Sequence, residues 1–332
     1  MKKFYMSLYR KINKLPRMVR IEACSLCQLN CTECYMREIP NKTIIGNGYL
    51  KYDDFKKFIE TNPYIEEIEL SFSGEIFLNP DLLKIIKYAY EKEIALTAFN
   101  GVNFNDVSDE MLEALVKYKF MGLTISIDGA TNETYSIYRR NGSLDKVIAN
   151  IKKLNKYKEK YFSKFPVLQW QFIVFEHNKS EINAAIDLAY ELKINDIQFK
   201  KPWNKKEILD TNFIRNNKKF LLLKNNTMQD KEINKLILKN IIPICLQLWI
   251  QPQINWNGCL LGCCCSIDKE LNVNVFESNL KKALNSARMK YARKIVTGKE
   301  LPDDSIFCKK CCIYIERQKN NDFVDIKKIK FL

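Results

Sequence analysis

Short apolar runs alternate with amphipathic segments over the first two hundred residues of the chain. The apolar runs predict strands at residues 19–24, 65–72, 94–99, 123–127, 167–175 and 196–199. Between them, apolar residues recur at helical spacing and predict helices at residues 53–60, 80–91, 108–119, 143–157 and 180–192. Six strands that alternate with helices favour an α/β fold with a parallel sheet and helices outside it.

Two residues are expected to cap helices in this part of the chain. Asn79 precedes Pro80, and a polar cap followed by Pro at the first helical position is a favoured helix start. Ser108 precedes a segment whose apolar residues fall on one helix face, namely Met111, Leu112, Leu115 and Val116.

Polar residues and glycines follow the ends of five predicted strands. In folds of this kind, sites form where parallel strands end at their carboxyl termini. We therefore expect one rim to carry the loop after Ala23, Gly74-Glu75, Asn100-Gly101, Asp128-Gly129 and Asn178.

The remaining chain is less regular. Residues 201–240 are rich in Lys and Asn and predict a linker with one or two helices. Further on, Leu248-Trp249 and residues 254–258 predict two strands, with Asn257-Gly258 as a hairpin turn. The expected domains are an extension (1–15), the α/β core (16–200), the linker (201–240), a second domain (241–320) and a tail (321–332).

No run of 18 apolar residues occurs, so no transmembrane segment is expected. The basic first twenty residues contain no continuous apolar core of a secretory signal, and we expect a cytoplasmic protein. Phe4, Leu8 and Ile12 suit a helix, which would pack against the domain or lie on a membrane surface.

Composition indicates the possible partners. The chain has 332 residues, 46% of them hydrophobic, and a formal net charge of +15. Such a charge favours anionic ligands, including nucleotides, phosphorylated small molecules, and an acidic electron donor such as flavodoxin or ferredoxin. The alternative is that the positive charge reflects a general abundance of Lys, Ile and Asn along the chain rather than one basic surface patch. The single His nearly excludes His-ligated zinc and Ser-His or Cys-His catalysis.

The twelve cysteines fall into two groups, at residues 24–34 and 245–312. In a protein that stays in a reducing compartment, such groups indicate metal binding or catalysis rather than disulfides. Cys27, Cys31 and Cys34 have C-x3-C-x2-C spacing on a short polar loop. A [4Fe-4S] cluster is usually held by four thiolates, so three would leave one iron open. The spacing alone also suits part of a zinc site.

This motif, with aromatic Tyr35 directly after its last cysteine, resembles the signature of the radical S-adenosylmethionine (radical SAM) enzymes. The resemblance implies an open (β/α)6 TIM-like barrel in which a turn after the second strand binds the SAM amino group. The family's Gly-Gly-Glu-Pro-like turn reads Ser73-Gly74-Glu75-Ile76 here, so Gly74 and Glu75 remain. An ordinary strand-ending glycine turn is the alternative.

Residues 126–140 look like the stretch that follows the fourth strand in these enzymes. The resemblance places Ser126 near the SAM ribose or methionyl group, Arg139 on the SAM carboxylate and Asn100 in the adenosyl pocket. It also counts Tyr35 and Asp128 among the cofactor-binding residues. For Arg139, a solvated charge at a helix end is the alternative.

The second cysteine group resembles the SPASM or twitch extension of radical SAM proteins, a small α+β iron–sulfur domain. The resemblance rests on the spacing of Cys245, Gly258 and Cys263 and on the closing pair Cys308 and Cys311. It implies a second [4Fe-4S] cluster on these four cysteines, with no open iron. A zinc knuckle with the same ligands is the alternative.

Spare cysteines remain in this group. Cys264 or Cys312 would be able to replace a neighbouring ligand. Cys264, Cys265 and Cys312 are also candidate hydrogen-atom donors to a substrate radical, and buried apolar cysteines are the alternative.

By this resemblance, SAM is cleaved reductively to methionine and a 5′-deoxyadenosyl radical that removes hydrogen from a substrate. The last four cysteines resemble those of twitch-type dehydrogenases that act on aminocyclitols. We therefore expect oxidation or epimerisation of a small polar alcohol such as a sugar, nucleotide-sugar or aminocyclitol, with the auxiliary cluster as electron acceptor.

Two other functions remain as alternatives. One is a SPASM-type maturase that modifies a ribosomal peptide. Such enzymes usually carry an N-terminal recognition domain of about 80–100 residues, whereas few residues precede the first strand here. The other is a zinc protein that binds nucleic acid, which leaves the βα alternation unexplained. No nucleic-acid partner is expected.

Overall fold

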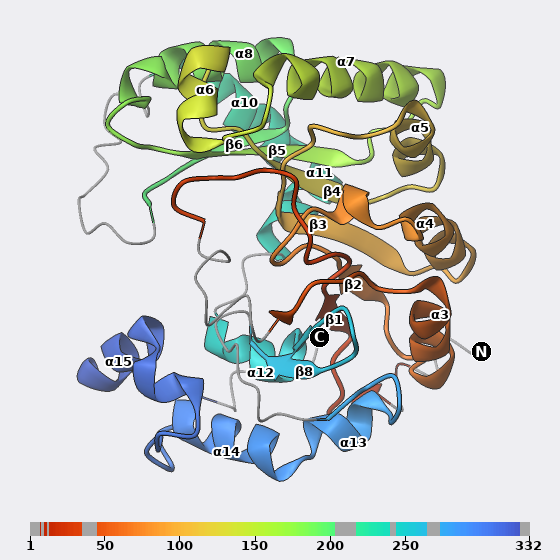
Figure 1. Cartoon of the computed structure of the whole chain (residues 1–332), viewed down its shortest axis with the longest axis vertical. Helices are drawn as coiled ribbons and strands as arrows, with labels where there is room; N and C mark the ends of the chain where they lie inside the picture. Colours follow the sequence, from red (N-terminus) through yellow and green to blue (C-terminus); the bar gives the residue numbers. More distant parts are fainter. Residues whose placement is uncertain are drawn as a thin grey trace. The chain divides into compact units, whose positions relative to one another are not determined.

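The computed structural model describes residues 7, 10–11, 13–34, 45–202, 217–239, 244–263 and 273–325. The chain forms two compact units, whose segments can be located in Figure 1 from the bar of residue numbers. The first contains Met1–Leu26, Met36–Ile94 and Ile242–Leu332, and the second contains Cys27–Tyr35 and Ala95–Ile241. The cysteine loop therefore belongs to the second unit, although the strand before it belongs to the first.

The first unit is built on strand β1 (Met18–Ile21), which lies between β2 (Glu67–Glu69) and β7 (Gln253–Ile254) and is parallel to both. Strand β8 (Leu260–Gly262) pairs antiparallel with β7. Helices α3 (Tyr52–Thr61) and α4 (Leu82–Glu91) follow β1 and β2. The C-terminal part adds α12 (Gln247–Ile250), α13 (Leu280–Leu284), α14 (Ala287–Val296) and α15 (Cys312–Lys319).

The second unit contains four parallel strands in the order β3 (Ala95–Val102), β4 (Gly122–Ser126), β5 (Val167–Ile173) and β6 (Asp196–Lys200). Its helices are α5 (Asp109–Lys117), α6 (Asn132–Tyr138), α7 (Leu144–Lys160), α8 (Ile182–Glu191), α10 (Lys218–Gln229) and α11 (Lys231–Lys239).

The two faces of this second sheet differ in polarity. Successive strand residues point to opposite faces, and one face presents the fully buried Leu123, Ile125, Leu168 and Trp170. On the other face, Thr124, Gln169 and Asp196 stand side by side in register across three strands. Thr124 donates to Gln169, and Gln169 donates to Asp196, each at 3.2 Å. The sheet thus has one apolar face and one that is hydrogen-bonded and polar.

The last two helices of the second unit pack on the sheet beside β5 and β6, where Phe220 of α10 also contacts Phe199 of β6. Lys224 of α10 pairs with Asp196 at the start of β6. Helix α11 packs Ile233, Leu236 and Ile237 against Val167, the first residue of β5. The contacts of Lys224 and of α11 lie near the amino-terminal ends of the strands. Functional sites of parallel sheets form at the opposite, carboxyl-terminal ends.

The predicted alternation of strands and helices and the α/β class are confirmed, as is the Ser108 cap, which accepts from the Met111 N–H at 3.2 Å. Two local predictions need correction, and one helix was missed. Leu248-Trp249 lies in helix α12, not in a strand. Helix α4 begins at Leu82 with Asp81 as its N-cap residue, so Asn79 lies before the cap; its Oδ1 accepts from the Asp81 N–H at 2.8 Å, and its Nδ2 donates to the carbonyls of Ala23 and Leu50 at 2.9 Å each. Helix α6 was not predicted.

The hairpin prediction is correct where it concerns the turn. Asn257-Gly258 connects β7 to β8, and Gly258 has a φ of +86°, which glycine adopts without strain. The predicted helix around Phe4, Leu8 and Ile12 lies outside the described residues. The predicted domain boundaries stay a prediction.

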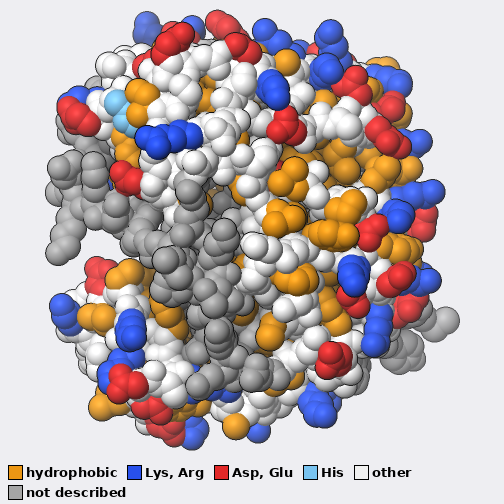
Figure 2. Space-filling model, viewed as in Figure 1, with side chains coloured by type: hydrophobic (Ala, Val, Ile, Leu, Met, Phe, Trp, Pro, Cys, Tyr) orange, Lys and Arg blue, Asp and Glu red, His pale blue; other side chains and the backbone are white. Residues whose placement is uncertain are grey.

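The surface shows charges of both signs. Lys and Arg side chains are interspersed with Asp and Glu over the face seen in Figure 2. Several of them pair, such as Lys153 with Asp109 at 2.8 Å and Lys160 with Glu113 at 2.6 Å. None of the helices in the described part of the chain is long and apolar enough to cross a membrane.

Candidate functional site

The loop that carries the first cysteine motif is packed on one side and open on the other. Cys31 is buried in an apolar cluster with Leu29, Tyr138 and Phe175, and Cys34 packs against the same cluster. Cys27 is exposed. Burial raises the pKa of the Cys31 thiol, and the neighbouring Arg139 guanidinium opposes this rise. One side of the loop is therefore packed on apolar side chains, whereas the Cys27 thiol is accessible to solvent.

The end of helix α6 holds the loop around Cys31. The N–H groups of Asn30 and Thr32 donate to the carbonyls of Arg140 and Tyr138, at 2.9 and 3.3 Å. The last carbonyls of a helix have no partner within it, so they are free to accept bonds from another segment. The two bonds flank Cys31 on both sides and fix the path of the loop there.

Arg139 lies between the cysteine loop and a buried carboxylate. Its Nε is 2.5 Å from Oδ2 of Asp128, and its Nη1 donates to Sγ of Cys31 at 3.8 Å. The Asp128 side chain is fully buried and its Oδ1 also accepts from the Ile173 N–H at 2.6 Å. Burial alone would lower the pKa of Arg139, but the charge of Asp128 raises it well above its usual value. The guanidinium is therefore a fixed cation.

The Arg139 side chain is only 12% exposed, so the alternative of a solvated charge is wrong. Its guanidinium also stacks over the ring of Tyr138, at 5.0 Å. The proposed contact with a SAM carboxylate stays a prediction. Asp128, which was expected to bind cofactor, here holds Arg139 in place.

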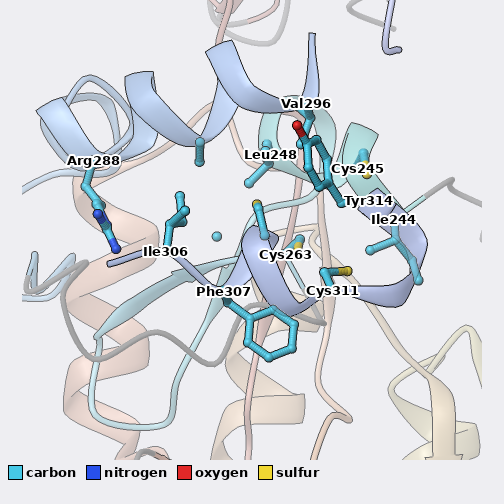
Figure 3. A pocket seen from close by; sticks show the side chains of 13 residues that line it. Ile244, Cys245, Leu248, Cys263, Arg288, Val296, Ile306, Phe307, Cys311 and Tyr314 are labelled. Atoms are coloured by element: carbon cyan, nitrogen blue, oxygen red, sulfur yellow. The ribbon is translucent and has the colours of Figure 1, made fainter. Parts of the chain in front are cut away.

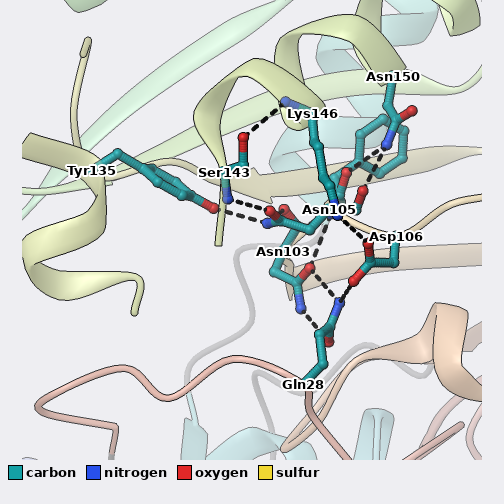
Figure 4. Close-up of polar contacts among 9 residues, drawn as sticks. Gln28, Asn103, Asn105, Asp106, Tyr135, Ser143, Lys146 and Asn150 are labelled. Atoms are coloured by element: carbon teal, nitrogen blue, oxygen red, sulfur yellow. Dashed lines mark hydrogen bonds and ion pairs between the residues drawn. The ribbon is translucent and has the colours of Figure 1, made fainter. Parts of the chain in front are cut away.

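The other end of the loop is held by amide side chains (Figure 4). Gln28 and Asn103 exchange two hydrogen bonds, at 3.2 and 3.1 Å, and Gln28 also donates to Asp106 at 3.1 Å. The Asn103 amide donates to Sγ of Cys27 at 3.7 Å. Asp106 in turn pairs with Lys146 of α7 at 3.0 Å. Residues outside the cysteine motif thus fix its first cysteine.

Two further predicted residues lie near the carboxyl ends of β3 and β4. Ser126 is buried and ends β4, whereas Asn100 is exposed. Gly101 next to Asn100 has a φ of +125°, and a Cβ there would lie 2.9 Å from Oγ of Ser126. A glycine is therefore needed for β3 to pass close to Ser126.

In the first unit, the turn Ser73-Gly74-Glu75 packs tightly on the segment that leads to the cysteine loop. A Cβ on Gly74 would lie 2.3 to 2.6 Å from backbone atoms of residues 24–26, a distance that no side chain tolerates. The Glu75 N–H donates to the Leu26 carbonyl at 2.8 Å. Its buried carboxylate accepts from the Phe77 N–H at 3.3 Å. Gly74 and Glu75 thus shape the backbone here.

Glu22, at the end of β1, supports the same turn. Its carboxylate accepts from the N–H and the hydroxyl of Ser73, at 2.6 and 2.7 Å. The carboxyl is fully buried, and this burial raises its pKa to about 7 against the opposing effect of the Ser73 bonds. Ser73, which replaces a glycine of the expected motif, therefore provides a bond that a glycine lacks.

The four cysteines of the second set line one cavity in the first unit. Cys245, Cys263, Cys308 and Cys311 surround it together with apolar side chains, and Figure 3 shows three of these cysteines by label. In the part of the chain that the structure describes, no three His, Cys, Asp or Glu side chains are gathered tightly enough to hold one metal ion. The four thiols therefore share a cavity rather than a preformed single-ion site.

The spare cysteines are placed only in part. Cys312 is exposed at the first position of α15 and does not line the cavity, whereas Cys311 is buried and does. Of this pair, Cys311 is the one positioned as a ligand. Cys264, Cys265 and Tyr35 lie outside the described residues, so their predicted roles stay predictions.

Sequence reasoning missed several residues that support the site. Gln28 lies inside the cysteine motif, and Asn103, Asn105 and Asp106 lie in the polar segment after β3. Asn and Asp are common where a chain turns, so the segment was indistinguishable from an ordinary loop. Glu22 was missed because its position in an apolar strand gives no indication that Ser73 is its partner.

Known proteins resemble parts of this chain. A family model described as the Radical SAM superfamily matches residues 21–188. The AdoMet-dependent heme synthase of Methanosarcina barkeri (strain Fusaro / DSM 804) is 30% identical over 179 residues, which are 53% of this chain and 48% of that protein. The GTP 3′,8-cyclase of Clostridium perfringens (strain SM101 / Type A) is 27% identical over 187 residues, 54% of each chain. The chain thus spans about half the length of these two curated relatives.

Solved structures resemble a larger part of the chain. Streptococcus suis SuiB bound to its precursor peptide SuiA has a TM-score of 0.62 at 14% identity, over 93% of this chain and 73% of SuiB. SuiB bound to S-adenosylmethionine gives the same TM-score over 93% of this chain and 72% of SuiB. At this identity the likeness shows the fold alone. It confirms the predicted partial (β/α)6 TIM-like barrel followed by a small C-terminal α+β domain.

Proposed function

This chain belongs to the radical SAM superfamily, and from that premise we propose that it is an oxidoreductase that binds SAM and two [4Fe-4S] clusters and acts on a small polar substrate. The proposed reaction is oxidation or epimerisation of an alcohol. The observation that carries the two-cluster proposal is the presence of two separate cysteine sets, one on an open loop and one around a cavity.

The first set fits a cluster with one open iron. Cys27, Cys31 and Cys34 are the three thiols of the loop, and N–H donors from Asn103 and Arg139 already point at two of their sulfurs. When bound there, the cluster supplies the electron that splits SAM into methionine and a 5′-deoxyadenosyl radical. We assign Gly74 and Glu75 to the SAM amino group, Ser126, Asn100 and Arg139 to the rest of the cofactor, and Asp128 to the orientation of Arg139.

The second set fits a cluster closed by four thiolates. The Cys245, Cys263, Cys308 and Cys311 side chains share a cavity that is otherwise mainly apolar, which suits a cluster held away from water. A closed set has no position left for substrate, so its role here is to accept an electron. A zinc knuckle is the competing occupant, and a colourless protein that contains zinc but no iron would support it.

The polar face of the second sheet supports a polar substrate. Toward the carboxyl ends of β5 and β6 it carries Gln171, Gln198 and Lys200, and Lys200 donates to Gln171 at 2.7 Å. Amide and ammonium groups bind hydroxyl, phosphate and carboxylate groups by hydrogen bonds. We therefore propose an anionic or hydroxyl-rich small molecule, with an acidic flavodoxin or ferredoxin as the electron donor.

Peptide modification remains a second candidate because one specific observation favours it. The fold resembles that of SuiB, which was solved with its precursor peptide. The two curated relatives carry names that refer instead to heme and GTP.

The decisive experiment follows hydrogen transfer. Reconstituted protein with SAM and dithionite should release 5′-deoxyadenosine. With the true substrate, deuterium on the reacting carbon should move into 5′-deoxyadenosine, and oxidation should leave a new carbonyl. Product of unchanged mass that takes one deuterium from heavy water indicates epimerisation, with Cys264, Cys265 and Cys312 as the first donors to test. Deuterium transfer from a peptide and from no small alcohol would overturn the small-substrate proposal.

A further inference from the structure

Two N–H donors from outside the cysteine motif point at its sulfur atoms. Asn103 donates to Cys27 at 3.7 Å and Arg139 donates to Cys31 at 3.8 Å. Sulfur is a weak acceptor when it is part of a thiol, but a thiolate bound to iron carries charge and accepts more strongly. Each donor is held by partners of its own, so its orientation does not depend on the cysteine.

The orientation of the Asn103 amide is fixed by a backbone group. Its Oδ1 accepts from the Asn105 N–H at 3.0 Å, and a backbone N–H can only donate. The atom on that side must therefore be the oxygen, which leaves Nδ2 to face Cys27 and Gln28. The loop that presents Asn103 is itself fixed, since Asn150 donates to the carbonyls of Phe104 and Asn105 at 3.0 and 3.1 Å.

The two donors belong to one hydrogen-bonded network. Asn105 donates to the hydroxyl of Tyr135 at 2.9 Å, and its own Oδ1 accepts from the Ser143 N–H at 2.7 Å. Tyr135 lies in α6, and Arg139 caps the carboxyl end of that helix. Figure 4 shows Asn105 between Asn103 and Tyr135. We call this set the brace; it consists of Gln28, Asn103, Asn105, Tyr135, Arg139 and Asp128.

We propose that Asn103 and Arg139 are positioning residues that fix Cys27 and Cys31 and raise the reduction potential of the cluster these cysteines hold. The inference rests on the proposed function only in requiring a cluster on this loop. Hydrogen bonds to the sulfurs stabilise the extra negative charge of the reduced cluster, so each donor makes reduction easier. The Arg139 cation acts in the same direction as its N–H group.

Substitution of Asn103 provides the direct test. Asn103→Asp keeps the oxygen that accepts from Asn105 but turns a second oxygen, with a negative charge, toward Cys27. Asn103→Leu removes the donor without adding charge. The readout is an EPR-monitored potentiometric titration without SAM. The titration follows the EPR signal of the first cluster, which is identified as the signal that disappears when Cys27, Cys31 and Cys34 are all changed to Ala.

We expect Asn103→Asp to lower the ratio of reduced to oxidised cluster at least about tenfold at fixed potential, a shift of about 59 mV to more negative values. Asn103→Leu should shift the potential in the same direction by less. The matched control is Asn155→Asp, because the side-chain amide of Asn155 in α7 donates to the Leu192 carbonyl at 2.8 Å, and Asn155 is not part of the brace. It should leave the potential unchanged.

A second pair of variants decides the question if the Asn103 variants do not load iron. Lys146→Met leaves Asp106 uncompensated beside Gln28, and this negative charge should also lower the potential. Lys153→Met breaks a similar exposed pair with Asp109 in the same helix, outside the brace, and should not. Potentials equal to wild type in Lys146→Met and in every Asn103 variant that loads iron overturn the inference. Wild-type protein that loads no iron on this loop overturns the proposed function itself.

Discussion

At the scale of single residues, the protonation of Glu22 is coupled to the stability of the fold around the turn that begins at Ser73. Its carboxyl is fully buried and its pKa is raised to about 7 by that burial. An unfolded chain exposes the same carboxyl to water, where its pKa is ordinary. The folded protein therefore holds a proton on Glu22 over a pH range in which the unfolded chain has lost it, and folding becomes less favourable as pH rises through that range.

This linkage predicts the effect of Glu22→Gln. Wild-type protein should lose about 2 kcal/mol of its free energy of unfolding between pH 5 and pH 8 through this group, since each pKa unit corresponds to about 1.4 kcal/mol. Over the same pH interval, the free energy of unfolding of Glu22→Gln should fall by about 2 kcal/mol less than that of wild type, because glutamine does not titrate. Urea unfolding at the two pH values measures the difference. Glu66→Gln, at an exposed glutamate paired with Arg17, is the control and should behave as wild type. Parallel pH dependences for Glu22→Gln and wild type would contradict the assignment.

At the scale of structural elements, the turn after β2 depends on backbone contact rather than on side-chain charge. Gly74→Ala should weaken SAM binding at least about tenfold, because the new Cβ would meet backbone atoms of residues 24–26 and move the turn. Ser73→Ala is the matched variant. It loses the hydroxyl bond to Glu22 but keeps the N–H bond, so its effect should be smaller. Equilibrium binding of SAM to reconstituted protein gives both values, and equal affinities for Gly74→Ala and wild type would refute this role.

The elements also show what the sequence alone was able to predict. The strands of the second unit were predictable from their apolar runs, but the end of β3 was not: the strand continues past the predicted end at Phe99, through Asn100-Gly101, to Val102. Helix α6 was missed because only Tyr135 and Tyr138 among its seven residues are buried, which is too weak a periodicity. The short segment at Leu248-Trp249 has no periodicity at all, so strand and helix were indistinguishable there.

The same limit applies to the candidate site. The seven cysteines were singled out by spacing and by family resemblance, and their role as cluster ligands stays a prediction, although the structure does place the four of the second set around one cavity. Spacing did not separate Cys311 from Cys312, and the structure does so only because α15 starts at Cys312 and leaves it exposed. Long-range pairs such as Gln28 with Asn103 and Glu22 with Ser73 depend on tertiary packing, and no local pattern reveals them.

At the scale of the whole molecule, the two cysteine sets belong to different compact units, so their roles should separate by mutation. Wild-type reconstituted protein should hold about eight iron and eight sulfide, and Cys308→Ser about half of each. Cys308→Ser should still cleave SAM, because Cys27, Cys31 and Cys34 are intact, but should form no oxidised product. The triple change of Cys27, Cys31 and Cys34 to Ala should keep about half of the iron and abolish SAM cleavage. Cys312→Ser is the control for iron content and SAM cleavage only, since that exposed cysteine does not line the cavity. Normal product formation by iron-depleted Cys308→Ser would show that the second cluster is not the electron acceptor.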